Sequence, residues 1–239
     1  MGKVGGGVMR KAGRDVWGLA LVGLSGVAVF TALGMVFLYA PREATMGDVQ
    51  RIFYFHVASA WVGFFAFCVT FVASVAYLAR GARRWDMLAL SSVEIGLAFI
   101  AMAVISGSLW ARPVWGTYWT WEPRLTISAV QLLIYAAYGM LRASVESAEQ
   151  KARFAAVYGI VAFVTVPLSW FAIRWWRTIH PDVLTGGPGM AITPPMVHTL
   201  LAALAAFTLL YATLLRQRVR LERAADTLAR LRLQVASEE

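Results

Sequence analysis

Six long apolar runs dominate this 239-residue chain, and each is long enough to cross a lipid bilayer as a helix. A single crossing requires about 20 apolar residues. Backbone groups in lipid must be hydrogen-bonded within the protein, and the alternating pattern of barrel strands is absent, so the runs predict helices. The predicted class is therefore an all-α integral membrane protein with six transmembrane helices, at roughly Trp17–Ala40, Phe53–Ala79, Met87–Ala111, Leu125–Leu141, Phe154–Ile173 and Pro195–Leu215.

The lysines and arginines predict how this bundle is oriented. With both termini in the cytoplasm, sixteen of the 22 basic residues fall on the cytoplasmic side and six on the other. This asymmetry is the usual orientation signal of membrane proteins. We expect 1–16 to be a cytoplasmic tail, 17–215 the membrane domain, and 216–239 a basic cytoplasmic helix that meets solvent or anionic lipid. The net charge of +9 then reflects topology, and we expect no nucleic-acid partner.

Tryptophans are concentrated in one connection on the predicted outer side, the loop 112–124. An interfacial aromatic belt places only one or two aromatic residues at each helix end. A dense group favours a platform for a flat apolar ligand, with arginines for its anionic groups. The group comprises Trp110, Trp115, Trp119, Trp121 and Tyr118, with Arg112, Glu122 and Arg124 between them.

All three histidines, His56, His180 and His198, lie at or near the same outer side. Two neutral imidazoles from separate segments can hold an iron from its two faces. Together with the aromatic platform, they describe a haem site better than a bare metal site, and the carboxylate-rich ligand set of Ca²⁺ or Mg²⁺ is absent.

Other single residues carry weaker expectations. Cys68 is the only cysteine, so neither an intramolecular disulfide nor covalent haem attachment through Cys-x-x-Cys-His is possible. Glu94 lies in the middle of the third run, where a carboxyl is costly, and we expect a structural or assembly role for it. The outer segment 41–52 fits either a short interfacial helix or a loop.

The segment WGTYWTWEPRLT, Trp115 to Thr126, resembles the WGxxWxWDxRLT signature of the haem-handling proteins of cytochrome c biogenesis, most closely the CcmC family. The IFYFHV around His56 and the WWxxxH ending at His180 also fit, and the likeness covers roughly 15–215. The resemblance implies that these two histidines are axial haem ligands. It further implies that Trp115, Trp119 and Trp121 cradle the macrocycle beside Tyr118, and that Arg124 pairs with a propionate. Glu122 stands where the family usually has Asp, which keeps the charge and adds one methylene.

The resemblance also implies a function. Haem b would be bound non-covalently at the outer face of the bacterial inner membrane and delivered to the periplasmic haem chaperone CcmE. The partners would be the ATP-binding-cassette subunits CcmA and CcmB and the small membrane subunit CcmD, and the chain would not be an enzyme. It has no G-x-x-x-x-G-K-[ST] motif, so nucleotide chemistry would belong to a partner.

Three other functions are weaker on the sequence. A membrane b-type cytochrome for electron transfer usually has histidines at both depths of the bundle, and the predicted inner side has none. A haem-translocating transporter needs polar residues along several spans. A purely structural subunit of an ABC complex would not explain the tryptophan loop.

Overall fold

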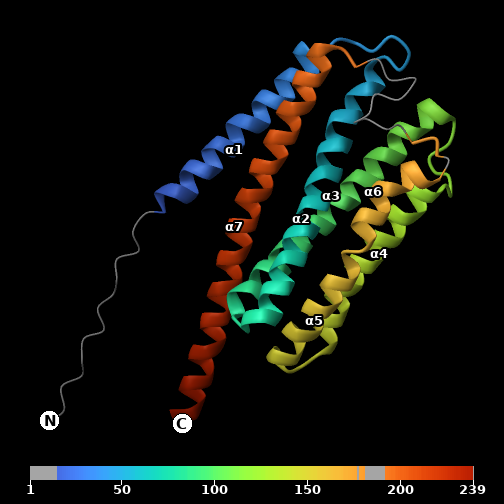
Figure 1. The fold of residues 1–239 in the computed structure, drawn as a ribbon. Helices are drawn as coiled ribbons and strands as arrows, with labels where there is room; N and C mark the ends of the chain where they lie inside the picture. Colours follow the sequence, from blue (N-terminus) through green and yellow to red (C-terminus); the bar gives the residue numbers. More distant parts are fainter. Residues whose placement is uncertain (1–14, 177, 181–191, 239) are drawn as a thin grey trace.

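The computed structural model describes residues 15–176, 178–180 and 192–238, and nearly all of them are helical (Figure 1). Six helical segments are long and apolar enough to span a membrane, which confirms the six-helix, all-α prediction. These segments are Val16–Tyr39, Asp48–Arg80, Arg83–Trp115, Pro123–Ser144, Ala148–Trp175 and Pro194–Ser237. Within them the helices are α1 (Val16–Gly34), α2 (Ile52–Arg80), α3 (Arg83–Trp115), α4 (Pro123–Ser144), α5 (Ala148–Ala162), α6 (Thr165–Trp175) and α7 (Pro194–Glu238).

The antiparallel pair α2 and α3 forms the centre of the bundle, with α1 and α7 on one side and α4 to α6 on the other (Figure 1). The connections that follow α1 and α3 lie at one end of the bundle together with the last turn of α6, and we call this the tryptophan end. The connections that follow α2 and α4 lie at the opposite end, together with the last part of α7. We call this the basic end, because it carries Arg83, Arg142 and Lys151.

Helix α3 runs four residues into the loop predicted for 112–124, so the connection to α4 is only 116–122. Pro113 is tolerated in the last turn because it removes a single intrahelical hydrogen bond there. The helix then ends at Gly116, whose φ of 77° is readily adopted by glycine and whose N–H donates to the Arg112 carbonyl at 2.9 Å. The short connection holds its tryptophans close to the ends of both helices.

The fifth span is two helices rather than one, because α5 ends at Ala162 and α6 begins at Thr165. Pro167 explains the interruption. Its ring lacks an N–H and clashes with the carbonyl four residues earlier, which is that of Phe163. The Val166 N–H bonds the Phe163 carbonyl at 2.9 Å, and the Leu168 N–H bonds the Val164 carbonyl at 3.3 Å. Beyond this interruption, α6 continues to the tryptophan end (Figure 1).

Helix α7 is 45 residues long, about 68 Å, which exceeds the roughly 30 Å hydrocarbon core of a bilayer. It continues through 216–238 beyond the last apolar run and packs along α1. On α1 the buried residues are small ones seven positions apart, Gly18, Ser25 and Ala32, which allow close approach of the two helices.

Glu94 of α3 forms a two-pronged ion pair with Arg218 of α7, at 2.6 and 3.0 Å.

The outer segment 41–52 is mainly a loop. Its helical part is the 3₁₀ turn Asp48–Arg51, which leads directly into α2. Before it, Gly47 donates to the Glu43 carbonyl at 3.0 Å, and the Glu43 carboxylate accepts from the Thr45 N–H at 2.7 Å.

Candidate functional site

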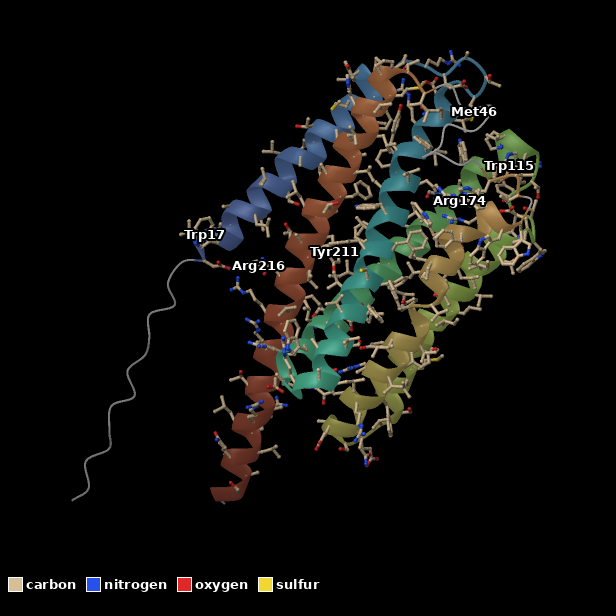
Figure 2. All side chains as sticks on the ribbon, in the orientation of Figure 1. Trp17, Met46, Trp115, Arg174, Tyr211 and Arg216 are labelled. Atoms are coloured by element: carbon tan, nitrogen blue, oxygen red, sulfur yellow. The ribbon has the colours of Figure 1, made fainter. Side chains whose placement is uncertain are left out.

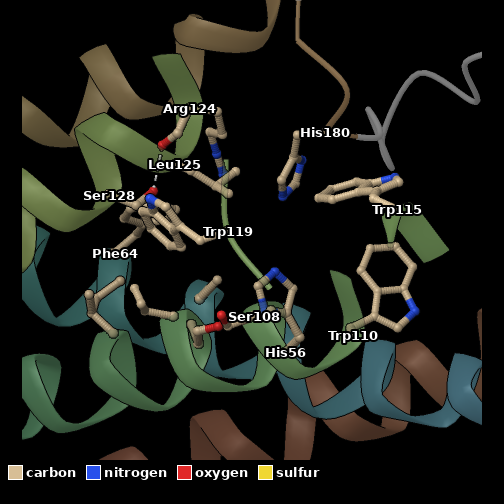
Figure 3. Close-up of a pocket in the computed structure, with 15 residues that line it drawn as sticks. His56, Phe64, Ser108, Trp110, Trp115, Trp119, Arg124, Leu125, Ser128 and His180 are labelled. Atoms are coloured by element: carbon tan, nitrogen blue, oxygen red, sulfur yellow. Dashed lines mark hydrogen bonds between the residues drawn. The ribbon is translucent and has the colours of Figure 1, made fainter. Parts of the chain in front are cut away.

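His56 and His180 face each other across a cavity at the tryptophan end (Figure 3). His56 lies in the second turn of α2, and His180 lies in the segment that follows α6. Their ring centres are 6.3 Å apart and the rings are inclined by 44°. Both side chains are half-buried. The fold thus brings together two histidines that are 124 positions apart in the sequence.

This separation is the one that two imidazoles need in order to bind one metal ion from opposite sides. Metal–imidazole bonds are about 2.0–2.1 Å long, and a ring centre lies about 1.1 Å beyond its ligating nitrogen, so the two ring centres would be about 6.3 Å apart. The observed distance matches this value. The ring spacing is therefore compatible with one iron held between the two imidazoles.

The His56 ring is held in the state that a ligand requires. Its Nδ1 lies 2.9 Å from the Ala103 carbonyl oxygen on α3. A carbonyl only accepts, so Nδ1 carries a proton, and in the neutral ring Nε2 then has the lone pair. Gly107 lets α3 approach the ring, since a β-carbon there would lie 2.7 Å from Cε1 of His56. No sequence pattern indicated Gly107, apart from its place one turn before Trp110.

Three tryptophans line the cavity: Trp110, Trp115 and Trp119. Trp110 and Trp115 come from the end of α3 with ring centres 6.1 Å apart, and Trp119 comes from the connection to α4. In Figure 3, Trp110 and Trp115 lie on one side of the histidine pair and Trp119 and Arg124 on the other. Apolar aromatic surface therefore flanks the histidines on both sides.

A second, larger cavity of about 710 Å³ adjoins the first, and His56, His180, Trp110 and Arg124 line both. The smaller cavity has a volume of about 70 Å³. The larger one is mostly apolar, runs between α2, α6 and α7, and has the size of an ordinary ligand pocket. The histidine pair lies where the two cavities meet.

Arginines supply positive charge at this site. Arg124 begins α4, lines both cavities and donates to the Ser169 carbonyl of α6. Arg174 lines the larger cavity from the end of α6, and Figure 2 shows it near Trp115 at the tryptophan end. Arg174 was missing from the predicted site residues, because the sequence indicated only its side of the membrane.

Glu122 does not line either cavity and instead connects the tryptophan motif to the segment that carries His180. It precedes α4, and its carboxylate accepts a hydrogen bond from the Thr178 hydroxyl. The same hydroxyl accepts the His180 backbone N–H at 3.0 Å. Thr178 was also missed, and no sequence signal distinguished it.

The remaining candidates lie farther out. Trp121 is 79% exposed and packs edge-on against Trp119 at 5.8 Å. Tyr118 is exposed, and the Arg112 guanidinium lies over its ring at 5.5 Å. His198 lies on α7, where its Nδ1 is 3.1 Å from the Tyr39 hydroxyl.

Six spanning helices with a histidine-lined and tryptophan-lined cavity at one end define a polytopic membrane protein with a ligand site near one membrane face. The chain belongs to the CcmC family, described as Heme exporter protein C, whose family model matches residues 9–234. It is 35% identical to Heme exporter protein C of Bradyrhizobium diazoefficiens over 76% of this chain and 73% of the relative. It is 29% identical to Heme exporter protein C of Escherichia coli K12, over 85% of this chain and 83% of that one.

Proposed function

We propose that this chain binds haem b non-covalently between His56 and His180 and delivers it to the haem chaperone CcmE for c-type cytochrome maturation. Membership of the CcmC family and relatives named Heme exporter protein C support a role in haem handling. The observation that carries the proposal is the 6.3 Å separation of the two imidazole rings. The haem is cargo, and we propose no enzymatic activity.

Each site residue has a physical role in this proposal. The two imidazoles ligate the iron, His56 through its bare Nε2. Trp110, Trp115 and Trp119 provide apolar surface for the macrocycle. Arg124 and Arg174 line the larger cavity and would pair with the propionates.

Tyr118 and Trp121 belong to the outer surface of the same loop. We propose that they form the part of the haem platform that a docking partner also contacts. Exposed aromatic residues of this kind are enriched where proteins associate.

Transfer to a partner fits the absence of covalent attachment. Two coordinate bonds and apolar contacts hold the cofactor, and all of them can be exchanged. We propose that the tryptophan end faces the periplasm, with both termini in the cytoplasm, because 16 of the 22 basic residues are then cytoplasmic. The assembly would include the ABC subunits CcmA and CcmB and the small subunit CcmD in the bacterial inner membrane, with the helix 216–238 extending into the cytoplasm.

Absorption and EPR spectra of the purified protein with added hemin test the ligand assignment. The wild type should give the low-spin signature of bis-imidazole haem, and His56→Ala or His180→Ala should abolish it. His198→Ala is the matched control and should leave the spectrum unchanged, since this residue bonds Tyr39 instead. A low-spin spectrum that survives in the His56→Ala, His180→Ala double variant would refute the assignment. Delivery is tested by haem transfer from the loaded wild type to purified CcmE.

A further inference from the structure

Every buried residue of α4 carries a polar group in its side chain, although α4 spans the membrane. The buried residues of this helix are Gln131, Tyr135, Tyr138 and Arg142. They are spaced by four, three and four positions, so they lie along one side of the helix. Arg124 and Ser128 continue the same row toward the tryptophan end.

The other side of α4 is apolar, because its Val130, Leu133 and Met140 are exposed. Polar residues that face the interior of a membrane bundle mark ion or proton pathways or water-filled cavities.

The row connects two cavities. The histidine-lined cavity extends down to Ser128 on α4 and Ile100 on α3. A third cavity, of about 380 Å³, opens at the basic end and extends up to Tyr135 on α4 and Leu97 on α3. Leu97 and Ile100 are separated by about 4.5 Å of helix rise. On α4, Gln131 is the buried residue between the two linings.

Buried polar atoms along this row have no hydrogen-bond partner among the described residues. They include both amide atoms of Gln131 and the hydroxyl of Tyr135, side chains that are 0% and 1% exposed. Ser74 of α2, also buried, has an unpaired hydroxyl and lies close to the row. A β-carbon built on Gly159 would lie 3.0 Å from Ser74 Oγ and 3.6 Å from a ring carbon of Tyr138, so these two side chains meet at the same place.

Unpaired groups of this kind call for water. A buried donor or acceptor without a partner costs about 1–3 kcal/mol, and buried waters normally supply the missing hydrogen bonds. The basic-end cavity is a source of such water, because charged side chains line it: Arg83, Glu94, Arg142, Lys151 and Glu222.

We propose that waters occupy this row and that protons pass along them between the basic-end cavity and the histidine-lined cavity, with Gln131 at the narrowest point. A proton enters as hydronium at the basic end. In each transfer one O–H bond breaks as the next forms, so no oxidant or reductant is needed. The ligands are water and the hydrated proton. The description of the receiving cavity as a haem cavity rests on the proposed function. The proposed passage of protons along the row does not depend on it.

Proton flux into liposomes tests this without haem, so failure would leave the haem proposal untouched. Purified protein is reconstituted with a trapped pH-sensitive dye, and a pH step is applied with potassium and valinomycin to balance charge. The wild type should acidify the lumen faster than protein-free liposomes. Gln131→Leu has a similar size and no amide, and it should reduce the flux to the protein-free rate. Leu133→Ala, on the exposed side of the same helix, should match the wild type.

Tyr135→Phe is a second variant, in case Gln131→Leu fails to fold. It keeps the ring that stacks on Phe67 at 3.4 Å and removes only the hydroxyl, so it should give an intermediate flux. Gel filtration establishes the folding of each variant. A wild-type flux equal to that of protein-free liposomes would overturn the proposal. So would an unchanged flux in a folded Gln131→Leu or Tyr135→Phe variant.

Discussion

The hydroxyl of Thr178 joins Glu122 to His180: it donates to the Glu122 carboxylate and accepts the His180 backbone N–H at 3.0 Å. Glu122 and Thr178 are 56 positions apart, at the start of α4 and after the end of α6. The acidic residue of the tryptophan motif therefore positions a histidine-bearing segment from outside the cavity.

Replacing Thr178 by valine should weaken haem binding because it removes both hydrogen bonds and keeps the side-chain shape. Loss of a group that orients a metal-ligating residue typically costs about 10- to 100-fold in affinity. Hemin titration followed by the low-spin absorption band measures this. Thr45→Val, at an exposed loop position of the same end, is the control and should bind like the wild type. Equal affinities of the two variants would show that Thr178 does not position His180.

Gly107→Ala should displace the His56 ring. The added β-carbon would lie 2.7 Å from Cε1 and 3.0 Å from Nδ1 of His56, closer than real contacts allow. The ring must then turn away from the Ala103 carbonyl, and we expect the low-spin haem spectrum to be lost. Gly139→Ala is the matched control, since nothing lies within 4 Å of a β-carbon there. A normal bis-imidazole spectrum for Gly107→Ala would mean that this packing does not fix the ligand.

Asp15 should make the contact between the start of α1 and α7 dependent on pH. The Gly18 backbone N–H donates to its carboxylate, and Arg216 and Arg220 of α7 pair with it, so the pKa of Asp15 is below its ordinary value. A lowered pKa means that this contribution is present at neutral pH and is lost as pH falls through the folded-state pKa. Figure 2 shows Trp17 and Arg216 at this contact.

Spin labels at positions 17 and 217 can measure the effect in a Cys68→Ser background, because Cys68 is exposed on α2. The distance distribution should stay constant from pH 7 to pH 5 and broaden below the ordinary Asp pKa of 3.8. Asp15→Asn should broaden it already at pH 7. A narrow distribution in that variant would show that α1 is held by its small-residue contacts alone.

The six spans were predictable because about 20 consecutive apolar residues have few alternatives to a membrane helix. Their ends were less predictable. Helix α3 continued four residues beyond its apolar run before Gly116 ended it, and the helix of the fifth span was interrupted near Pro167 although its apolar run continued. The apolar pattern placed Glu94 in the middle of the third span without a partner. In the structure its carboxylate pairs with Arg218, which lies on α7 beyond the last apolar run.

Part of the site could be predicted because histidine and tryptophan carry recognisable chemistry. The spacing of His56 and His180 is set by how α2 and the segment after α6 pack, which no local pattern encodes. Thr178, Gly107 and Arg174 reach the site only through tertiary packing, so no local sequence pattern distinguishes them. Residues 181–191, which follow His180, lie outside the described residues.

The buried ion pair between Asp86 and Arg142 should be the costliest polar contact to break in the bundle. Arg142 Nη1 and Nη2 lie 2.5 and 3.2 Å from the two Asp86 oxygens, and the side chains are 9% and 2% exposed. Removing one partner from a buried pair leaves an uncompensated charge and costs about 3–5 kcal/mol. Arg142→Met should therefore lower the thermal midpoint of the detergent-solubilised protein strongly. Arg83, which also bonds Asp86, is half-exposed and only partly replaces the lost cation.

The double variant Asp86→Leu, Arg142→Met distinguishes charge burial from packing. It removes both charges together, and replacing a buried pair by apolar residues is often nearly neutral. We therefore expect its thermal midpoint to lie above that of Arg142→Met. Arg230→Ala, which breaks the i,i+4 pair with Asp226 by removing an arginine that is 69% exposed, is the control and should shift the midpoint little. A double variant less stable than the single one would mean that the pair stabilises the α3–α4 contact beyond the cost of burying its charges.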